Sequence, residues 1–168
     1  AEAIAAALED LAAKGFAGSV GVIAPFRQQV ATIEDAARGR VSPEALGRLD
    51  VKIATVDAFQ GGERDVILVS LAAGATMPPG ARRFIEGDRR RFNVAVSRAR
   101  AVCRIFGDLA FARTSGIPHL ARLAARATAG AEAETAWSGV FDSPWERRLH
   151  EAMTARGLEP EPQYEIGG

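Results

Sequence analysis

Hydrophobic residues in this chain gather in short continuous runs, separated by stretches with helical spacing. The continuous runs predict strands, which we place at residues 20–24, 51–56, 66–71 and 101–106. Apolar residues recur at helical spacing over residues 4–14 and 28–38, with Gly15 and Gly39 as the expected helix ends. Because the strands are continuously apolar rather than alternating, we expect a parallel sheet covered by helices on both faces, which is an α/β fold.

The pattern changes after the last predicted strand. Residues 113–139 are rich in Ala and Arg and predict a helical linker. At residues 143–146 a Ser can cap a new helix, a Pro takes its first position and a Glu follows three residues after the cap. We therefore expect an α/β domain at residues 1–112, the linker, and the start of another domain at residues 140–168. The first residues already predict a helix and the last ones a strand, so we expect a piece of a longer protein.

The composition permits a packed core and hides a local excess of positive charge. Apolar residues make up 48% of the 168 residues, and the formal net charge is zero. A concentrated basic stretch matters more for anion binding than the total does. Such a stretch is formed by Arg82, Arg83, Arg89, Arg90, Arg91, Arg98, Arg100 and Arg104.

The single cysteine, Cys103, lies in an apolar run, so we expect a buried structural thiol. One cysteine can build neither a disulfide framework nor a zinc site, and the chain offers no other metal site. The sequence has no signal peptide and no membrane span. We therefore expect a cytoplasmic, bacterial protein with no membrane partner.

Two loops beside predicted strands carry unusual polar groups. In residues 24–29, Arg27 and two amides stand at a helix start, where a phosphate could bind, although an ordinary strand-to-helix turn looks the same. In residues 55–65, paired glycines would let a ligand approach the backbone closely. A hydroxyl, an amide and a carboxylate in that loop suit phosphate or sugar groups, although a polar hairpin loop remains the alternative.

A third segment, residues 90–100, predicts a basic helix. Phe92, Ala95, Val96 and Ala99 follow the spacing of one buried helical face. Arg91 and Arg98 are seven residues apart, so we expect both on one flank of that face. Their mutual repulsion is modest, and two arginines on one flank are useful where both contact the same anion. A guanidinium directed at a triphosphate stabilises charge in phosphoryl transfer. A solvated basic helix is the alternative interpretation.

Together the three segments resemble motifs IV, V and VI of superfamily 1B helicases, of the nonsense-mediated-decay and Okazaki-processing type. Residues 56–65 resemble the motif V pattern V-D-x-F-Q-G-x-E-x-D, and residues 90–100 resemble the motif VI pattern R-R-x-N-V-A-x-[ST]-R-A-R. The match covers roughly residues 20–110. Both motifs at this spacing would rarely arise in an unrelated fold. The resemblance implies a RecA-like second motor domain.

The resemblance also implies roles for individual residues. Arg98 would be an arginine finger that reaches the γ-phosphate of ATP across a domain interface, and Arg91 would help link that phosphate to the partner domain. Glu63, with the backbone of Gly61 and Gly62, would approach the ribose and phosphates of the nucleotide. The residues that would face single-stranded DNA or RNA, or couple it to the nucleotide, are Pro25, Gln29, Thr55, Asp57 and Gln60.

The sequence departs from a complete motor in two respects. Residues 72–75 are Ala-Ala-Gly-Ala, where many relatives have a basic and polar run. No G-x-x-x-x-G-K-[ST] phosphate loop and no acidic box for magnesium occur in the sequence. ATP and Mg²⁺ would therefore be bound mainly by an N-terminal RecA-like domain of the same protein. We expect no hydrolysis of ATP by these residues alone.

The C-terminal segment, residues 140–168, resembles the opening of a restriction-endonuclease-like domain related to very-short-patch-repair nucleases. Glu146 would be its helical acid, while the Asp and Glu-x-Lys metal ligands of that fold are not in the sequence. An ordinary amphipathic helix and strand is the alternative. Two further alternatives concern the whole protein. The RecA-like domain could bind nucleic acid or protein without turnover, or a nuclease could do the main chemistry while the motor positions it.

Overall fold

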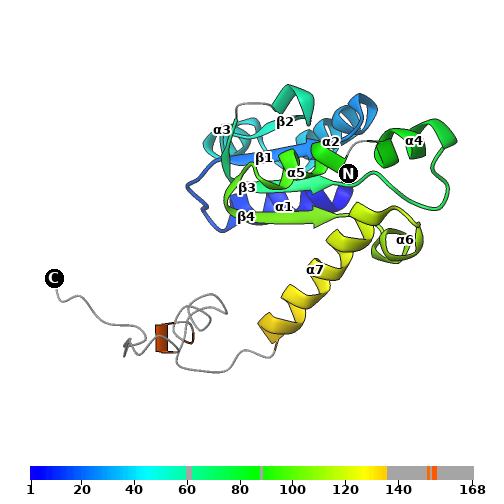
Figure 1. The fold of residues 1–168 in the computed structure, drawn as a ribbon. Helices are drawn as coiled ribbons and strands as arrows, with labels where there is room; N and C mark the ends of the chain where they lie inside the picture. The colour runs from blue at the N-terminus through cyan, green and yellow to red at the C-terminus, as the bar shows by residue number, and fades with distance from the viewer. Residues whose placement is uncertain (60–61, 88, 136–150, 152, 155–168) are drawn as a thin grey trace. The chain divides into compact units, whose positions relative to one another are not determined.

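The computed structural model describes residues 1–59, 62–87, 89–135, 151, 153 and 154. It divides into two compact units, residues 1–121 and 122–168. The first unit contains a sheet of four parallel strands in the order β2-β1-β3-β4 (Figure 1). The strands are β1 Val20–Ala24, β2 Lys52–Thr55, β3 Arg64–Ser70 and β4 Ala99–Phe106. The predicted α/β fold with a parallel sheet is confirmed.

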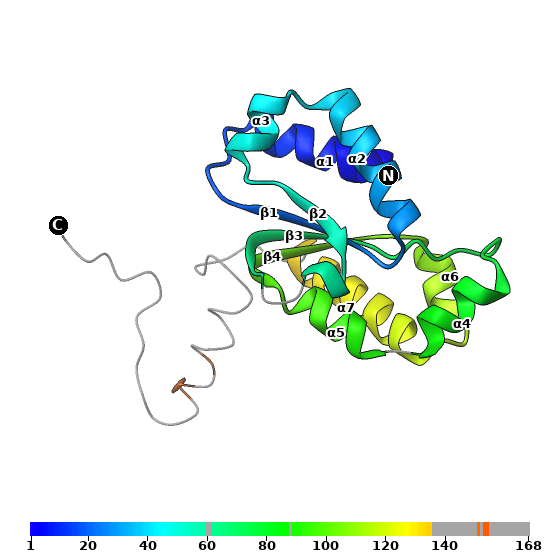
Figure 2. The ribbon, with the colours of Figure 1, turned by 90° about the horizontal axis from the view of Figure 1, so that it is seen from above.

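Helices cover both faces of the sheet, as the pattern predicted. One face carries α1 Glu2–Ala13, α2 Arg27–Arg40 and α3 Pro43–Arg48 (Figure 2). The other carries α4 Pro79–Gly87, α5 Arg89–Val96 and α6 Leu109–Thr114. A 3-10 turn, η1 Asp57–Phe59, follows β2. The last helix, α7 Pro118–Thr135, begins in the first unit and continues into the second.

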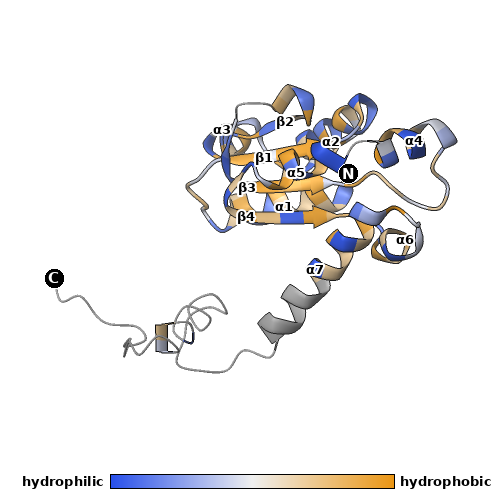
Figure 3. Cartoon of the chain, in the orientation of Figure 1, coloured by the Kyte–Doolittle hydropathy of each residue, from blue (hydrophilic) through white to orange (hydrophobic). Residues whose placement is uncertain are grey.

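The core lies between the two central strands and the helices α1, α2 and α3. All five residues of β1 are buried, as are the last five of β3, and the middle of β3 is as hydrophobic as β1 (Figure 3). Ile4 and Leu8 of α1 and Ile33 of α2 pack against them. A large apolar side chain contributes about 1.5–3 kcal/mol when it is buried. This packing holds the central strands in place, and with them the loops that follow the strands.

The two outer strands differ from the prediction of strands that are buried on both faces. In β2 only Ala54 is buried, and in β4 residues 101–104 are exposed. Val102 is 44% exposed, and the single cysteine, Cys103, is exposed as well. The expectation of a buried structural thiol is therefore wrong. The physical reason is position: among the described residues β4 pairs only with β3, so its other edge is free.

One predicted helix end is also wrong. Helix α2 does not stop at Gly39 but continues to Arg40. Val41 is extended, and the Oγ atom of Ser42 accepts a hydrogen bond of 3.2 Å from the backbone N–H of Ala45. This is an N-cap, and Pro43 takes the first position of α3. The start of the next helix therefore ends α2, and the flexible backbone of Gly39 does not.

Candidate functional site

The carboxyl ends of the strands bring two of the predicted segments together. Ala24 of β1 pairs with Thr55 of β2, and Ile23 pairs with Val69 of β3. Neighbouring strands lie about 4.8 Å apart. The loop that begins at Pro25 and the loop that begins at Val56 therefore leave the sheet side by side. This is the end of a parallel sheet where ligands usually bind.

The segment at residues 55–65 does not stay at that end of the sheet. It starts at the carboxyl end of β2 and runs back to Arg64, which is the first residue of β3. Phe59 anchors the crossing, because its ring is fully buried against Gly21, where an added Cβ would lie 2.5 Å from the ring. Gln60 and Gly61 lie outside the described residues.

The helix of the third segment ends earlier than predicted. Helix α5 stops at Val96, and the Ser97 N–H donates a hydrogen bond of 3.0 Å to the Asn93 carbonyl. Arg98 then leaves the helix, because its carbonyl accepts a hydrogen bond of 3.0 Å from the Arg64 N–H. Pairing with β3 thus replaces the last helical turn. The expectation that Arg91 and Arg98 share a helical flank is wrong.

Arg91 and Arg98 instead lie at opposite ends of α5. Arg91 is in the first turn, which lies at the carboxyl ends of the strands. Arg98 follows the last turn, beside the first residue of β3. A helix rises 1.5 Å per residue, so seven residues correspond to about 10 Å. The candidate residues accordingly sort into two clusters, one at each end of the sheet.

The amino-end cluster consists of Gly62, Glu63 and Arg98. The Arg98 Nε atom donates to the Val94 carbonyl at 3.2 Å, and an Nη atom lies 3.4 Å from the Ser97 hydroxyl. A guanidinium has more N–H donors than these two hydrogen bonds use. Glu63 is exposed. The cluster therefore offers a partly buried cation and an exposed carboxylate on neighbouring backbone segments.

Gly62 is a glycine that the fold itself does not require. A Cβ at this position would meet its nearest atom, the Phe59 carbonyl oxygen, at 3.5 Å, which is ordinary contact. At Gly21, by contrast, an added Cβ would lie 2.5 Å from Ile67 and from Phe59. Packing accounts for Gly21 but not for Gly62. An open backbone at residue 62 is compatible with close approach of a ligand.

The carboxyl-end cluster consists of Pro25, Gln29, Thr55, Asp57 and Arg91. The Gln29 Nε2 atom donates to the Ser70 hydroxyl at 3.2 Å, which ties α2 to β3. The Thr55 Oγ1 atom lies 3.5 Å from the backbone nitrogen of Ala58, at the turn η1. Gln29 therefore holds the start of α2 to the end of β3, and Thr55 stabilises the turn that follows β2.

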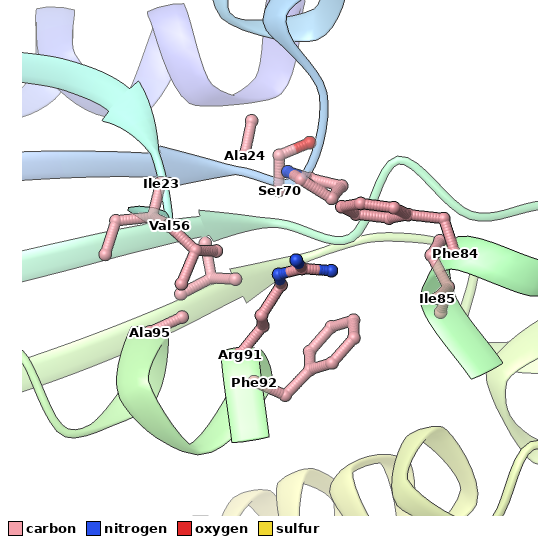
Figure 4. A pocket seen from close by; sticks show the side chains of 11 residues that line it. Ile23, Ala24, Val56, Ser70, Phe84, Ile85, Arg91, Phe92 and Ala95 are labelled. Atoms are coloured by element: carbon pink, nitrogen blue, oxygen red, sulfur yellow. The ribbon is translucent and has the colours of Figure 1, made fainter. Parts of the chain in front are cut away.

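The partners of Arg91 include two residues that the sequence did not identify as a set. Its Nε atom lies 3.5 Å from the Asp57 carboxylate. Its guanidinium carbon lies 4.4 Å from the centre of the Phe84 ring (Figure 4). Phe84 in turn lies 5.3 Å from Phe26, the residue before α2. Neither aromatic was singled out from the sequence. The signal available was a Phe among the arginines of α4.

The start of α2 adds a surface that suits an anion. Phe26 provides no side-chain cap, so the first N–H groups of this helix are not used by a capping side chain. Arg27 and Gln28 are exposed there. An open groove lies alongside, and the residues that line it include Gln28, Gln29, Thr32, Ala73 and Met77. A helix N-terminus beside an arginine favours phosphate.

The last residue of the motif V pattern, Asp65, has a structural role. One carboxylate oxygen accepts hydrogen bonds of 2.7 Å from both the N–H and the hydroxyl of Ser19. The Ser19 hydroxyl also accepts a hydrogen bond of 3.1 Å from the Asp65 N–H. These bonds, followed by the charge of Arg100, hold the pKa of Asp65 below its ordinary value. The pair fastens β1 to β3 at their amino ends.

The Arg98 guanidinium can donate to phosphate oxygens, and the exposed Glu63 carboxylate can accept hydrogen bonds from ribose hydroxyls. Arg91, which the sequence grouped with Arg98 at the γ-phosphate, lies in the carboxyl-end cluster instead. Among the described residues no group of three or more His, Cys, Asp or Glu could hold a metal ion. Glu146, the acid expected of a nuclease helix, lies outside the described residues.

Comparison with known proteins identifies the family. Residues 1–110 match a family described as AAA domain. "DNA polymerase alpha-associated DNA helicase A" of Saccharomyces cerevisiae is 32% identical over 105 residues, which is 61% of this chain and 14% of that protein. "RNA helicase Mov10l1" of Homo sapiens is 34% identical over 101 residues, 55% of this chain and 7% of that protein.

A third relative, "DNA replication ATP-dependent helicase/nuclease JHS1" of Arabidopsis thaliana, is 32% identical over 101 residues, 60% of this chain and 7% of that protein. The chain therefore belongs to the AAA domain family, as a superfamily 1 helicase domain. It spans between 7% and 14% of the length of these three relatives.

The comparisons also bear on the expected source and location. These relatives come from a yeast, a plant and a human, which does not fit a bacterial source. Within the part of the chain that the structure describes, no helix is both long and apolar enough to span a bilayer.

Proposed function

We propose that this chain is the second motor half of an ATP-dependent helicase or translocase that moves along single-stranded nucleic acid. The observation that carries the proposal is the position of α5, which lies between two clusters of different chemistry. Its first turn lies at the carboxyl ends of the strands, and Arg98 follows its last turn. Helix α5 thus connects a surface suited to single-stranded nucleic acid with a surface suited to a nucleotide.

At the amino-end cluster, Arg98 acts as the arginine finger. The family implies the use of ATP with Mg²⁺, and a first RecA-like domain of the same protein would supply the phosphate loop and the metal ligands. Bound there, the nucleotide supplies a γ-phosphate on which charge develops during transfer. Arg98 places positive charge beside it, Glu63 faces the ribose, and the open backbone at Gly62, together with Gly61, lets the phosphates approach.

At the carboxyl-end cluster, the chain grips the strand by its phosphates. The start of α2 offers N–H groups without a side-chain cap and Arg27, and the neighbouring loops contribute Pro25 and Thr55. Asp57 couples this surface to α5 through its ion pair with Arg91. Gln29 and Gln60 add amides. Contacts of this kind bind a backbone without reading the base sequence. The same surface suits DNA and RNA, because no feature of it distinguishes a 2′-hydroxyl.

The test is Arg98→Ala in the full-length protein. We expect ATP turnover to fall by about 10³-fold or more, because removal of a finger has that effect, while nucleotide affinity changes little. The matched control is Arg100→Ala, two residues further along and more than half exposed. The Arg100→Ala protein and the native protein should hydrolyse ATP at equal rates. Turnover by Arg98→Ala at the native rate would reject the finger, and absence of ATP turnover from the native full-length protein would favour a binding module without catalysis.

We also propose that residues 140–168 begin a nuclease domain of the restriction-endonuclease type. One relative is named as both a helicase and a nuclease, so the two activities occur together in a similar protein. In the full-length protein, Glu146→Gln should lower Mg²⁺-dependent cleavage of DNA and leave ATP turnover unchanged. Absence of metal-dependent cleavage from the native full-length protein would refute the proposal.

A further inference from the structure

We propose that Arg91 is a positioning residue that couples strand binding at the carboxyl-end cluster to Arg98 at the other end of α5. This inference rests on the function proposed above and adds a route by which the nucleic acid controls the arginine finger. It also assigns Arg91 a role different from direct contact with the nucleotide.

The first step is the environment of the Arg91 guanidinium. The Asp57 carboxylate lies 3.5 Å from Nε. The ring of Phe84 lies 4.4 Å from the guanidinium carbon (Figure 4). The side chain of Arg91 is 32% exposed and that of Asp57 is 64% exposed, so the ion pair stays open to water. The neighbouring carboxylate offsets the positive charge and would repel a phosphate placed beside it. These contacts favour an indirect role.

The second step is what the partners of Arg91 are attached to. Asp57 begins the turn η1 directly after β2, in the loop that contains Thr55 and Gln60. Phe84 lies 5.3 Å from Phe26, the residue before the exposed start of α2. A nucleic-acid strand that binds either loop therefore contacts the segments that hold Asp57 and Phe84, which in turn contact Arg91. Three segments far apart in the sequence meet at one side chain.

The third step is the helix itself. Arg91, Phe92 and Ala95 of α5 line a small apolar pocket, together with Ile23, Val56 and Val69 of the sheet side (Figure 4). This pocket lies beneath the first turns of α5, where the proposed coupling requires the helix to shift. The far end of α5 continues into Arg98, whose backbone is hydrogen-bonded to Arg64. The Arg98 Nε atom donates to the Val94 carbonyl of α5 at 3.2 Å, so a shift of α5 at Arg91 would reach the guanidinium while the Arg98 backbone stays paired with β3.

The experiment measures ATP turnover of the full-length protein with and without single-stranded nucleic acid, together with the KM for ATP. Phe84→Leu keeps the apolar bulk and removes the ring that faces Arg91. We expect the stimulation by nucleic acid to fall by about fivefold or more, the usual size of a coupling between sites, with basal turnover and KM unchanged. Phe84→Tyr, which keeps the ring, should retain the stimulation.

Arg91→Lys is the complementary variant, because it keeps the charge but loses the planar group that stacks on a ring. It should lose stimulation to the same extent, and the double variant with Phe84→Leu should lose no more than either single one. Arg89→Ala, an exposed arginine of the same helix, is the control. Should Arg91→Lys not fold, Phe84→Leu and Phe84→Tyr decide.

Native stimulation in Phe84→Leu would overturn the inference. So would a loss of basal turnover in Arg91→Lys as deep as that in Arg98→Ala, because Arg91 would then act at the nucleotide. If Arg98→Ala itself turns over at the native rate, the proposed function fails instead, and the two failures are thus distinguishable.

Discussion

The backbone N–H of Arg64 donates a hydrogen bond of 3.0 Å to the carbonyl oxygen of Arg98. This bond fixes the candidate finger beside Glu63, the residue before Arg64 in the chain. It also pairs β4 with β3, because the next residue, Ala99, is the register partner of Arg64. The geometry at the nucleotide end of the site therefore depends on strand pairing, which is more rigid than a loop.

We predict that Phe59 stabilises the loop that joins the two clusters. Phe59→Ala should lower the free energy of unfolding by about 3–5 kcal/mol, because the buried ring leaves a cavity. Urea denaturation measures this loss. Phe84→Ala is the control. Phe84 is 37% exposed, so its replacement should lower the free energy of unfolding much less. Equal losses in the two variants would contradict the assignment of Phe59 as the anchor.

The central strands, the fold class and the three polar segments were predictable from the sequence. Residues 20–24 form β1 with the predicted bounds, because a continuous apolar run admits one buried strand. The exposure of Cys103 was not predictable, because a run of apolar residues does not say whether a strand is central or at an edge.

The two ends of the site were not predictable either. The spacing of Phe92 and Ala99 fits a helix, but hydrogen bonding to β3 ends that helix at Val96. Pairing with a distant strand therefore overrides the helical spacing of apolar residues in the local sequence. The contact of Phe84 with Arg91 joins α4 to α5, and local spacing does not fix which faces of two short helices meet.

Asp65 gives a prediction for acid stability. Hydrogen bonds from Ser19 lower the pKa of Asp65 in the folded protein, so the folded state binds the proton less readily than the unfolded state. This stabilisation is present above about pH 4, the ordinary pKa of Asp, and is lost as the pH falls through the lower folded pKa. Asp65→Asn should therefore be less stable than the native protein at neutral pH.

The difference between Asp65→Asn and the native protein should shrink as the pH falls below 4. Thermal unfolding followed across that range measures it. Asp10→Asn is the control, because Asp10 pairs with exposed Lys14 at the surface of α1. A stability difference that stays constant down to the lowest pH would contradict the role assigned to the Ser19 pair.

Arg27 should contribute to strand binding through a phosphate. Arg27→Ala should weaken binding of a labelled single strand, whatever its sequence, and reduce the slope of log affinity against log salt by about 0.7. Fluorescence anisotropy of the full-length protein over a salt series measures both. Arg38→Ala is the control. Arg38 lies at the other end of α2, where it pairs with Glu34 and Asp35, so its removal should change neither the affinity nor its dependence on salt. Equal slopes for Arg27→Ala and the native protein would remove α2 from the interface.

Gly62 and Gly21 should respond differently to the same substitution. A Cβ fits at Gly62, so Gly62→Ala should leave unfolding unchanged and raise the KM for ATP by about tenfold, as expected when one phosphate contact is lost. Gly21→Ala should instead lower the melting temperature, because its Cβ would lie 2.5 Å from two buried side chains. A native KM in Gly62→Ala would place the nucleotide elsewhere.

The most direct measurement is the rate at which the full-length Arg98→Ala protein, in excess over ATP and well above its Kd, cleaves the bound ATP in a single turnover without nucleic acid. Under these conditions neither nucleotide affinity nor the strand contributes, so the rate reports the finger alone. If Arg98 completes the nucleotide site, the rate falls by about 10³-fold or more relative to native protein. A rate within about tenfold of the native one, less than 1.4 kcal/mol in the barrier, would contradict the account.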